Sequence, residues 1–292
     1  MGKRRRTMLY VPGNNPAMLQ QAGVYGADGL LLDLEDAVAL NQKDAARILV
    51  RNVIKNTNFY GAEVTVRMNH LDTPFGMADL KEIVPLQPDA LRYPKVDSVE
   101  ELQKLIAAVE AIEAEHNIKD SKMKIHAMIE TAVGVQNVFD IAGYSPRVDC
   151  ITIGGQDLTA DMNVVKTKEG NELDFARKRI VMAAKANGID CIDTVFADVD
   201  DDEGLAKETE YIKGIGFSGK AVINPRQIRV IHDVYNPTEQ EIRKAIRIIR
   251  EFNKNKEAGI GVFAIDGKMI DAPVVTRAQY VLDVAGIDVD NL

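Results

Sequence analysis

One carboxylate stands where the sequence otherwise predicts hydrophobic core. The stretch AMIETAVGV (127–135) begins as a buried strand, and Glu130 follows directly after its apolar residues. An isolated buried carboxylate is very costly unless it is paired, protonated or bound to a metal. The chemistry of the site therefore depends on which of these three states the fold gives to Glu130.

A second acid, Asp157 in GGQDL, follows the next apolar strand pattern. Because consecutive parallel strands lie side by side, we expect Glu130 and Asp157 to be neighbours. Two oxygen ligands with room for water suit Mg²⁺, whereas none of the four histidines has the spacing of a zinc ligand. Gly154 and Gly155 would let backbone amides approach a bound anion, so Gly155 is a candidate substrate-binding residue. An ion pair between Glu130 and Arg67 inside the fold is the alternative.

Further polar residues end the neighbouring strand patterns. Arg67 carries the planar fork that binds a carboxylate through two nitrogens, although an ordinary ion pair is equally compatible with its position. The cluster of Asp33, Glu35 and Asp36 is suited to accept hydrogen bonds from metal-bound waters rather than to hold the same ion. Asp36 could instead cap the following helix. Lys95 is expected to neutralise this cluster.

Eight short β-rich segments position these residues. Most are apolar on both faces, which is typical of a buried parallel sheet. Helical patterns separate them, among them 45–56, 173–188 and 99–117, the last with Ser98 as its N-cap. Eight βα units predict a (β/α)8 TIM barrel, whose chemistry sits at the carboxyl ends of the strands; a doubly wound α/β sheet is the alternative. The strands are expected at 7–11, 29–34, 63–68, 90–94, 124–129, 149–153, 190–195 and 220–224.

The pattern changes after residue 225. A long amphipathic helix is expected over 238–259, followed by the hairpin VFAIDGKMI and a further helix before residue 286. No barrel strand remains to be supplied by this part of the chain. We therefore predict a barrel catalytic domain over 1–230 and a C-terminal helical lid or oligomerisation segment over 231–292, which covers the barrel mouth or docks on a neighbouring subunit.

The composition limits the classes of function. The chain has 292 residues, of which 46% are hydrophobic and 27% charged, as in ordinary globular proteins. A net charge of −8 argues against nucleic acid as the main partner, and no apolar run has signal-peptide or membrane-spanning length. The basic start MGKRRR is expected to be a solvated tail. Cys150 and Cys191 lie in apolar segments without a CxxC pair, so we expect two reduced thiols in a cytoplasmic protein.

Seven motifs together resemble one family. In chain order, LYVPGNNP, LLDLEDAV, VRMN, IETAVGV, IGGQDL, AVINPRQI and GKMIDAPVV are similar to the citrate lyase beta subunits of the HpcH/HpaI aldolase superfamily, from residue 6 to about residue 285. The resemblance implies a (β/α)8 barrel, a Mg²⁺ ion and cleavage of a (3S)-citryl thioester to oxaloacetate and an acetyl thioester. A malyl- or citramalyl-thioester lyase, a pyruvate-type aldolase and a non-catalytic scaffold for a carrier protein are the alternatives.

The resemblance also implies roles for individual residues. Glu130 and Asp157 match the metal ligands of the family, and Arg67 matches the residue that binds the carboxylate of the oxo acid. Asp271 matches an acid that malyl-type lyases place in the site of the adjacent subunit, which implies an oligomer, and a homotrimer is our expectation. Asp271 would protonate the enolate. Glu35, Asp36 or a hydroxide on the metal would accept the proton of the substrate hydroxyl.

The thioester end departs from part of the family. Tyr10, Ile223 and Asn224 fall where relatives contact the pantetheine and nucleotide portions of the thioester. Ala17 and Gln21 stand where citramalyl-type lyases carry lysines, and a histidine is common where Asn224 stands. Both departures favour a thioester on an acyl carrier protein over free CoA, with citrate lyase alpha and gamma subunits as possible partners.

Overall fold

The computed structural model describes residues 4–257 and 262–288. The chain divides into two compact units, of which the first is Arg5–His232 and the second contains the residues from Asp233 onward. Each unit has its own architecture and is described by itself. Among the described residues, no helix has the length and apolar character needed to cross a membrane.

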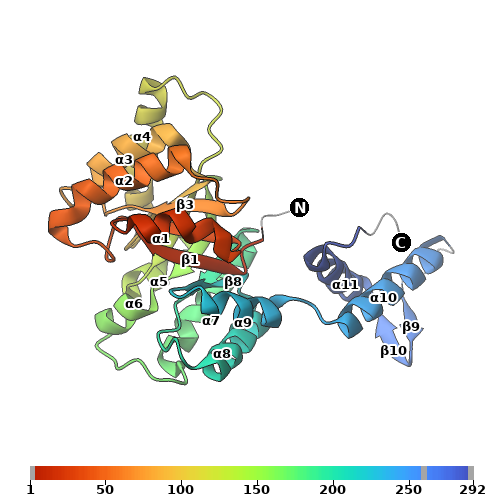
Figure 1. The fold of residues 1–292 in the computed structure, drawn as a ribbon. Helices are drawn as coiled ribbons and strands as arrows, with labels where there is room; N and C mark the ends of the chain where they lie inside the picture. The colour runs from red at the N-terminus through yellow and green to blue at the C-terminus, as the bar shows by residue number, and fades with distance from the viewer. Residues whose placement is uncertain (1–3, 258–261, 289–292) are drawn as a thin grey trace. The chain divides into compact units, whose positions relative to one another are not determined.

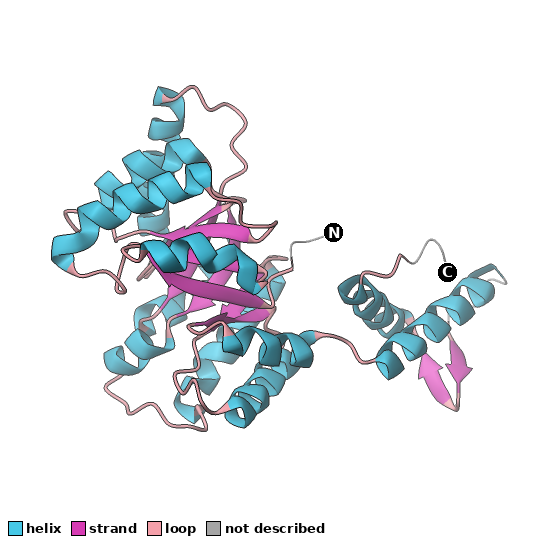
Figure 2. Ribbon diagram, viewed as in Figure 1, coloured by secondary structure: helices cyan, strands magenta, loops and turns pink. Residues whose placement is uncertain are grey.

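The first unit is a closed barrel of eight parallel strands, which Figures 1 and 2 show surrounded by helices. Each strand pairs with the next one in the sequence, and β8 pairs with β1 to close the barrel. The predicted (β/α)8 TIM barrel is thus confirmed, and a doubly wound sheet is excluded. The strands are β1 (Thr7–Pro12), β2 (Gly29–Asp33), β3 (Glu63–Arg67), β4 (Ala90–Tyr93), β5 (Lys124–Ile129), β6 (Val148–Ile153), β7 (Asp190–Asp193) and β8 (Gly219–Val222).

The helices of the barrel unit follow the strands and cover its outer side (Figure 2). Ser98 forms the predicted N-cap of α4 within a complete capping box with Glu101, and Asp201 caps α8. Four short 3-10 turns complete the connections: η1 (Ala22–Tyr25), η2 (Leu40–Gln42), η3 (Val84–Leu86) and η4 (Asn171–Leu173). The helices are α1 (Pro16–Gln21), α2 (Lys43–Asn56), α3 (Gly76–Ile83), α4 (Val99–Glu115), α5 (Ala132–Gly143), α6 (Gly155–Asp161), α7 (Asp174–Ala186), α8 (Asp202–Ile215) and α9 (Arg226–Tyr235), which ends just beyond the unit boundary.

Polar residues follow one line of in-register partners across four strands, and because barrel strands are tilted and staggered this line runs from the carboxyl ends of the strands toward their amino ends. Asp33 of β2 is paired in register with Arg67 of β3, Arg67 with Arg92 of β4, and Arg92 with His126 of β5. All four are buried. Buried charges must be paired or hydrogen-bonded to be tolerated, so the partners of each of these residues bear on how the barrel interior works.

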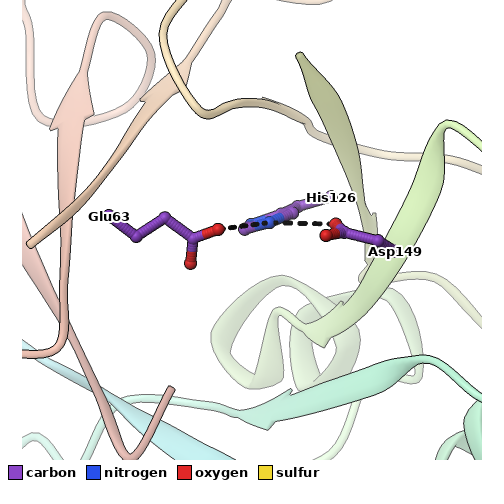
Figure 3. A group of neighbouring side chains, drawn as sticks. All are labelled: Glu63, His126 and Asp149. Carbon is purple, nitrogen blue, oxygen red and sulfur yellow. Dashed lines mark ion pairs between the residues drawn. The ribbon is translucent and has the colours of Figure 1, made fainter. Parts of the chain in front are cut away.

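The strand N-termini form a second polar cluster, shown in part in Figure 3. Metal-ligand-type atoms of Glu63, His126 and Asp149 lie within 4.8 Å of one another. The guanidinium of Arg5 already binds both carboxylates, at 2.7 Å from Glu63 and 2.6 Å from Asp149, and a third, Asp190, at 2.9 Å. The expectation of a solvated basic tail is therefore wrong for Arg5, because this buried side chain ties β3, β6 and β7 together at the base of the barrel.

The second unit contains α10 (Glu239–Glu257), β9 (Phe263–Ile265), β10 (Lys268–Ile270) and α11 (Ala272–Ala285). The two strands form the predicted hairpin, whose turn residues Asp266 and Gly267 both have positive φ, as a two-residue type I′ turn requires. The expected end of the long helix at 258–259 lies outside the described residues. This unit has its own apolar core, formed by Ala245, Ile248, Ile249, Ile270, Ala278 and Leu282.

We predict that Arg5→Met lowers the free energy of unfolding by about 3–5 kcal/mol, because it leaves the buried carboxylate of Glu63 and the partly buried ones of Asp149 and Asp190 without their cation. The matched control is Arg226→Met, which breaks an ion pair with Asp200 whose two side chains are 65% and 79% exposed and should cost less than about 1 kcal/mol. Urea unfolding measures both. Equal effects of the two substitutions would contradict the structural role of Arg5.

Candidate active site

A cavity of ≈ 460 Å³ opens at the carboxyl ends of the barrel strands. This is the end at which TIM barrels carry their chemistry. Several of the residues singled out from the sequence line this one cavity, although they are far apart in the chain. Its lining includes Tyr10, Asp33, Arg67, Gly155, Asp157 and Ile223.

Glu130 is 1% exposed, directly after β5. Its Oε1 accepts a hydrogen bond of 2.8 Å from the backbone N–H of Lys95, whereas Oε2 is buried without a hydrogen-bond partner among the described residues. Burial, followed by the charges of Asp157 and Glu35, raises the pKa of Glu130 to about 8. The alternative of an ion pair between Glu130 and Arg67 is not realised.

The backbone around Glu130 is constrained from two sides. Lys95 adopts φ +51°, a left-handed conformation that costs a non-glycine residue on the order of 1 kcal/mol, and its N–H is thereby directed at Glu130. On the other side, a Cβ added at Gly154 would meet Oε2 of Glu130 at 2.3 Å. Only glycine at position 154 leaves room for this carboxylate, so any larger residue there would displace the side chain of Glu130.

Asp157 lies in the first turn of α6 and lines the cavity. It is partly exposed and makes no hydrogen bond or ion pair with the described residues. Its charge is close enough to act on the pKa of Glu130. An unpartnered Glu130 oxygen and an uncommitted Asp157 carboxylate fit the oxygen ligands that a hard divalent cation takes.

Arg67 is held tightly at the cavity wall. Its Nε and Nη2 donate to the two oxygens of Asp33 at 2.7 and 2.6 Å, and its Nη1 lies 2.8 Å from Oε2 of Glu35 and 3.6 Å from Asp36. The ordinary ion pair considered from the sequence is therefore present. Asp33 fixes the plane of the guanidinium, and Nη1 is directed at Glu35.

Glu35 and Asp36 differ in their surroundings. Glu35 is 7% exposed, and burial, despite the opposing charge of Arg67, raises its pKa. Asp36 has a side chain that is 56% exposed and does not cap the following helix, since α2 begins at Lys43 after a 3-10 turn; that alternative was wrong. Lys95 Nζ lies 3.4 Å from Glu35, which agrees with a neutralising role.

The glycines after β6 do not offer free amides to an anion. The N–H of Gly155 donates to Thr194 Oγ1 at 3.0 Å, and that of Gly154 donates to Ile129 O at 2.9 Å. The anion-binding role expected of the Gly155 amide is therefore corrected. Gly155 contributes to the site as cavity wall, where its small size accommodates Thr194.

The rim of the cavity is apolar on the side of β8 and α1. Ile223 is 44% exposed, as are Met18 at 50% and Tyr25 at 41%, and all three line the cavity. Asn224 follows Ile223, and its Oδ1 accepts from the N–H of Arg226 at 3.0 Å. This rim suits an extended, mostly apolar substrate arm better than a polyphosphate.

Sequence reasoning missed Arg92, which is fully buried in β4. Its Cζ lies 5.8 Å from the centre of the Tyr10 ring, and the Cζ of Arg67 lies 5.2 Å from the same ring. Tyr10 is thus in contact with two guanidinium groups. The letters ALRYP did place a charge in an apolar strand, which was the available signal for an interior role.

Asp271 lies in the second unit, where it is the N-cap of α11 and accepts a hydrogen bond of 3.1 Å from the N–H of Val274. Capping is sufficient to account for an acid at this position. A role in chemistry therefore remains a prediction.

The barrel unit of the chain matches a protein-family model. The model described as HpcH/HpaI aldolase/citrate lyase matches residues 6–225, the whole barrel up to the end of β8. The chain belongs to this family.

Relatives in the HpcH/HpaI family match nearly the full chain. Citrate lyase subunit beta of Leuconostoc mesenteroides is 43% identical over 96% of this chain and 93% of its own length. Human mitochondrial citramalyl-CoA lyase is 31% identical over 96% of this chain and 85% of its own. The crystal structure of CitE from Mycobacterium tuberculosis in complex with magnesium, acetoacetate and coenzyme A is 28% identical, covers 96% of this chain and 98% of that one, and has a TM-score of 0.78.

We predict that Gly154→Ala lowers the affinity for a divalent cation at least about tenfold, because a Cβ would displace Glu130 Oε2 and one lost ligand contact is worth more than 1.4 kcal/mol. Calorimetric titration with Mg²⁺ and Mn²⁺ measures this. Gly214→Ala is the matched control, because nothing lies within 4 Å of its added Cβ in helix α8. Unchanged cation affinity in folded Gly154→Ala would show that Glu130 is not a ligand.

Proposed function

We propose that this chain is a carbon–carbon lyase that cleaves a (3S)-citryl thioester into oxaloacetate and an acetyl thioester. The observation that carries the proposal is the buried Glu130 with an unpartnered oxygen, within electrostatic reach of Asp157 and at the same barrel mouth as Arg67. Similarity to citrate lyase beta subunits over nearly the whole chain supports this substrate. Cleavage of citramalyl or malyl thioesters is the competing activity, and the similarity to citramalyl-CoA lyases supports it.

Glu130 and Asp157 are the residues that would hold Mg²⁺. The ion is present in the related CitE complex, and both carboxylates have the free oxygens that it needs. When bound, Mg²⁺ supplies Lewis-acid polarisation of the substrate hydroxyl and its neighbouring carboxylate. Lys95 and Gly154 keep the Glu130 carboxylate in place by a hydrogen bond and by shape, respectively.

Arg67 and Glu35 would then act together on the oxo-acid half. Asp33 orients the guanidinium of Arg67, and a substrate carboxylate replaces Glu35 at Nη1. Glu35, released from Arg67, accepts the hydroxyl proton. Its raised pKa makes it a stronger base than an ordinary glutamate, and we place the exposed Asp36 as its electrostatic neighbour. The electrons of the broken carbon–carbon bond pass to the thioester as an enolate.

The thioester arm would lie along the apolar rim. Ile223 contacts it from the end of β8, with Asn224 next in sequence. Tyr10, which the family resemblance also assigns to the thioester, lies deeper in the cavity, beyond the rim that would hold this arm. The rim carries no lysine or arginine among the described lining residues apart from Arg67. This favours a thioester on an acyl carrier protein over free CoA, whose nucleotide end carries phosphates that cations would pair with. Partnership with citrate lyase alpha and gamma subunits follows from this proposal.

Asp271 would deliver the proton that converts the enolate into the acetyl thioester. The family resemblance places this acid in the site of an adjacent subunit, so the proposal includes a homo-oligomer, with a trimer as our expectation. A carboxyl group positioned against the enolate carbon can transfer a proton to it. The second unit would in this way act as a lid for a neighbouring copy.

The deciding experiment is single-turnover cleavage by the purified chain with Mg²⁺. We expect citryl thioester to be cleaved at least about tenfold faster than malyl and citramalyl thioesters, a ratio that one added charge contact provides. The oxo acid released from each substrate (oxaloacetate from citryl, pyruvate from citramalyl, glyoxylate from malyl) is measured by coupled reduction. Preferred cleavage of citramalyl thioester would instead establish the competing activity, and binding of carrier protein without cleavage of any thioester would establish a scaffold.

In the same assay, Asp271→Asn should lower the cleavage rate about 100- to 1000-fold, the usual cost of removing one catalytic partner. Asparagine keeps the cap of α11, so the fold and the affinity for Mg²⁺ should not change. Normal turnover by this variant would remove Asp271 from the mechanism.

The raised pKa of Glu130 predicts a pH dependence of Mg²⁺ binding. With a pKa of about 8, Glu130 is mostly protonated at neutral pH and must lose that proton when it binds the ion. The affinity should therefore rise with pH, by up to about tenfold per unit below pH 8, and then level off. Calorimetry in buffers of different ionisation enthalpy should detect release of about one proton at pH 7. Glu130→Gln should abolish that release; a flat affinity between pH 6 and 9 would contradict the assignment.

A further inference from the structure

Arg92 is a buried cation without a counter-charge in the described part of the chain. It is 0% exposed, and its Nη1 donates to Tyr10 Oη at 3.3 Å. Its Nε and Nη2 are buried and find no hydrogen-bond partner among residues 4–257 and 262–288. Its register partner Arg67, in contrast, is matched by Asp33 and Glu35.

No carboxylate of the described residues lies within ion-pair distance of Arg92, and two groups whose charge acts with its own inside the barrel, His126 and Cys150, supply no negative charge. Burial lowers the pKa of His126, which keeps its ring neutral. Burial also raises the pKa of the Cys150 thiol well above its usual value, which keeps it protonated. A fold retains a buried, unpaired cation at considerable cost. Such a group indicates that a negative charge arrives from outside the chain.

Tyr10 connects this cation to the cavity. Its ring lines the cavity wall and packs against the interior cluster that includes Met8 and Ala221, which places it at the deep end rather than at the rim. A phenol oxygen accepts and donates at the same time. Because Tyr10 Oη accepts from Arg92, its own proton is available for an acceptor in the cavity, and the guanidinium strengthens that donation.

We propose that Tyr10 and Arg92 together recognise the second carboxylate of the oxo acid. This inference rests on the proposed function. The three competing thioesters differ in one substituent on the carbinol carbon: hydrogen in malyl, methyl in citramalyl, and a carboxymethyl group in citryl. Arg67 binds the carboxylate common to all three, and the Tyr10–Arg92 pair binds the one that only the citryl substrate has. Tyr10 touches substrate, and Arg92 is its positioning and specificity-determining residue.

Charge and geometry assign the two arginines to different carboxylates. Arg67 uses Nε and Nη2 on Asp33, which leaves one corner for one carboxylate. The Tyr10 ring lies between 5 and 6 Å from both guanidinium carbons. A dianionic oxo acid can therefore be held at two points beside the same ring. A site built to hydrogen-bond a polar group discriminates strongly against substrates that lack it, because its own polar atoms are then left unpaired.

The test uses three variants of the full chain. Tyr10→Phe removes the hydroxyl and keeps the ring, Arg92→Met removes the charge at similar length, and Arg92→Lys keeps the charge without the planar fork. For each, kcat/KM is measured with citryl, citramalyl and malyl thioesters. We expect Tyr10→Phe and Arg92→Met to lower kcat/KM for the citryl substrate by about 10- to 100-fold, the value of a charge-assisted hydrogen bond. The other two substrates should change by less than about threefold, with Arg92→Lys intermediate.

A binding measurement separates this proposal from the proposed function. Dissociation constants for oxaloacetate and pyruvate are measured by calorimetry with Mg²⁺ present. The wild-type chain should prefer oxaloacetate, and Tyr10→Phe and Arg92→Met should abolish the preference, whether or not the chain turns over a citryl thioester. If the wild type cleaved no thioester but showed this pattern, the proposed function would fail while the carboxylate site stood.

Two outcomes would overturn the inference. Equal losses for all three thioesters, or for both oxo acids, would show that Arg92 and Tyr10 are only structural. If Tyr10→Phe still bound oxaloacetate more tightly than pyruvate, another group would be responsible for binding the second carboxylate. If Arg92→Met failed to fold, Tyr10→Phe would still decide, because it leaves the buried ring in place.

Discussion

The site depends on the buried carboxyl group of Glu130, one of whose oxygens is hydrogen-bonded while the other has no partner among the described residues. Glu130 Oε1 is fixed by the N–H of Lys95, while Oε2 has no partner in the described chain. A carboxylate so deeply buried is unfavourable on its own. Two backbone features nevertheless hold Glu130 in this position. Lys95, in a left-handed conformation, donates its N–H to Oε1, and the absence of a Cβ at Gly154 leaves room for Oε2. Strain of this kind is stored where a ligand compensates for it, and a divalent cation held with Asp157 is the ligand that the donor set suits.

Charge balance then divides the barrel interior into zones with different functions. At the strand N-termini, Arg5 binds carboxylates from three strands and closes the base. At the strand C-termini, Arg67 is matched by Asp33 and Glu35. Between them, Arg92 has only Tyr10. The first two groups are saturated by the protein itself, whereas the third and Glu130 are not. An unpaired buried cation and a buried carboxyl group with a free oxygen, beside one cavity, are features that suit the binding of a charged substrate and its metal ion.

The two units contribute in different ways to this chemistry. The barrel carries the cavity, with Arg67 and Arg92 on strands and with Glu130 and Asp157 just beyond the ends of β5 and β6, and such rigid elements position side chains well. The second unit has its own core and presents Asp271 as a helix cap. Because Asp271 belongs to a separate unit, its proposed action on a neighbouring copy depends on assembly, whereas the residues of the barrel site all come from one chain.

The sequence by itself determined the eight-stranded barrel, its order of elements and the strand-end position of Glu130, Asp157 and Arg67. These follow from apolar periodicity and from caps such as Ser98, which are local properties of the chain. Only the tertiary structure decided which groups meet. Asp33 binds the guanidinium of Arg67, and the Gly155 amide donates to Thr194. Arg5 is buried, and Arg92 lies behind Tyr10 without a counter-charge among the described residues. Pairing depends on distances between residues remote in sequence, and hydrophobic patterning carries no information about such distances.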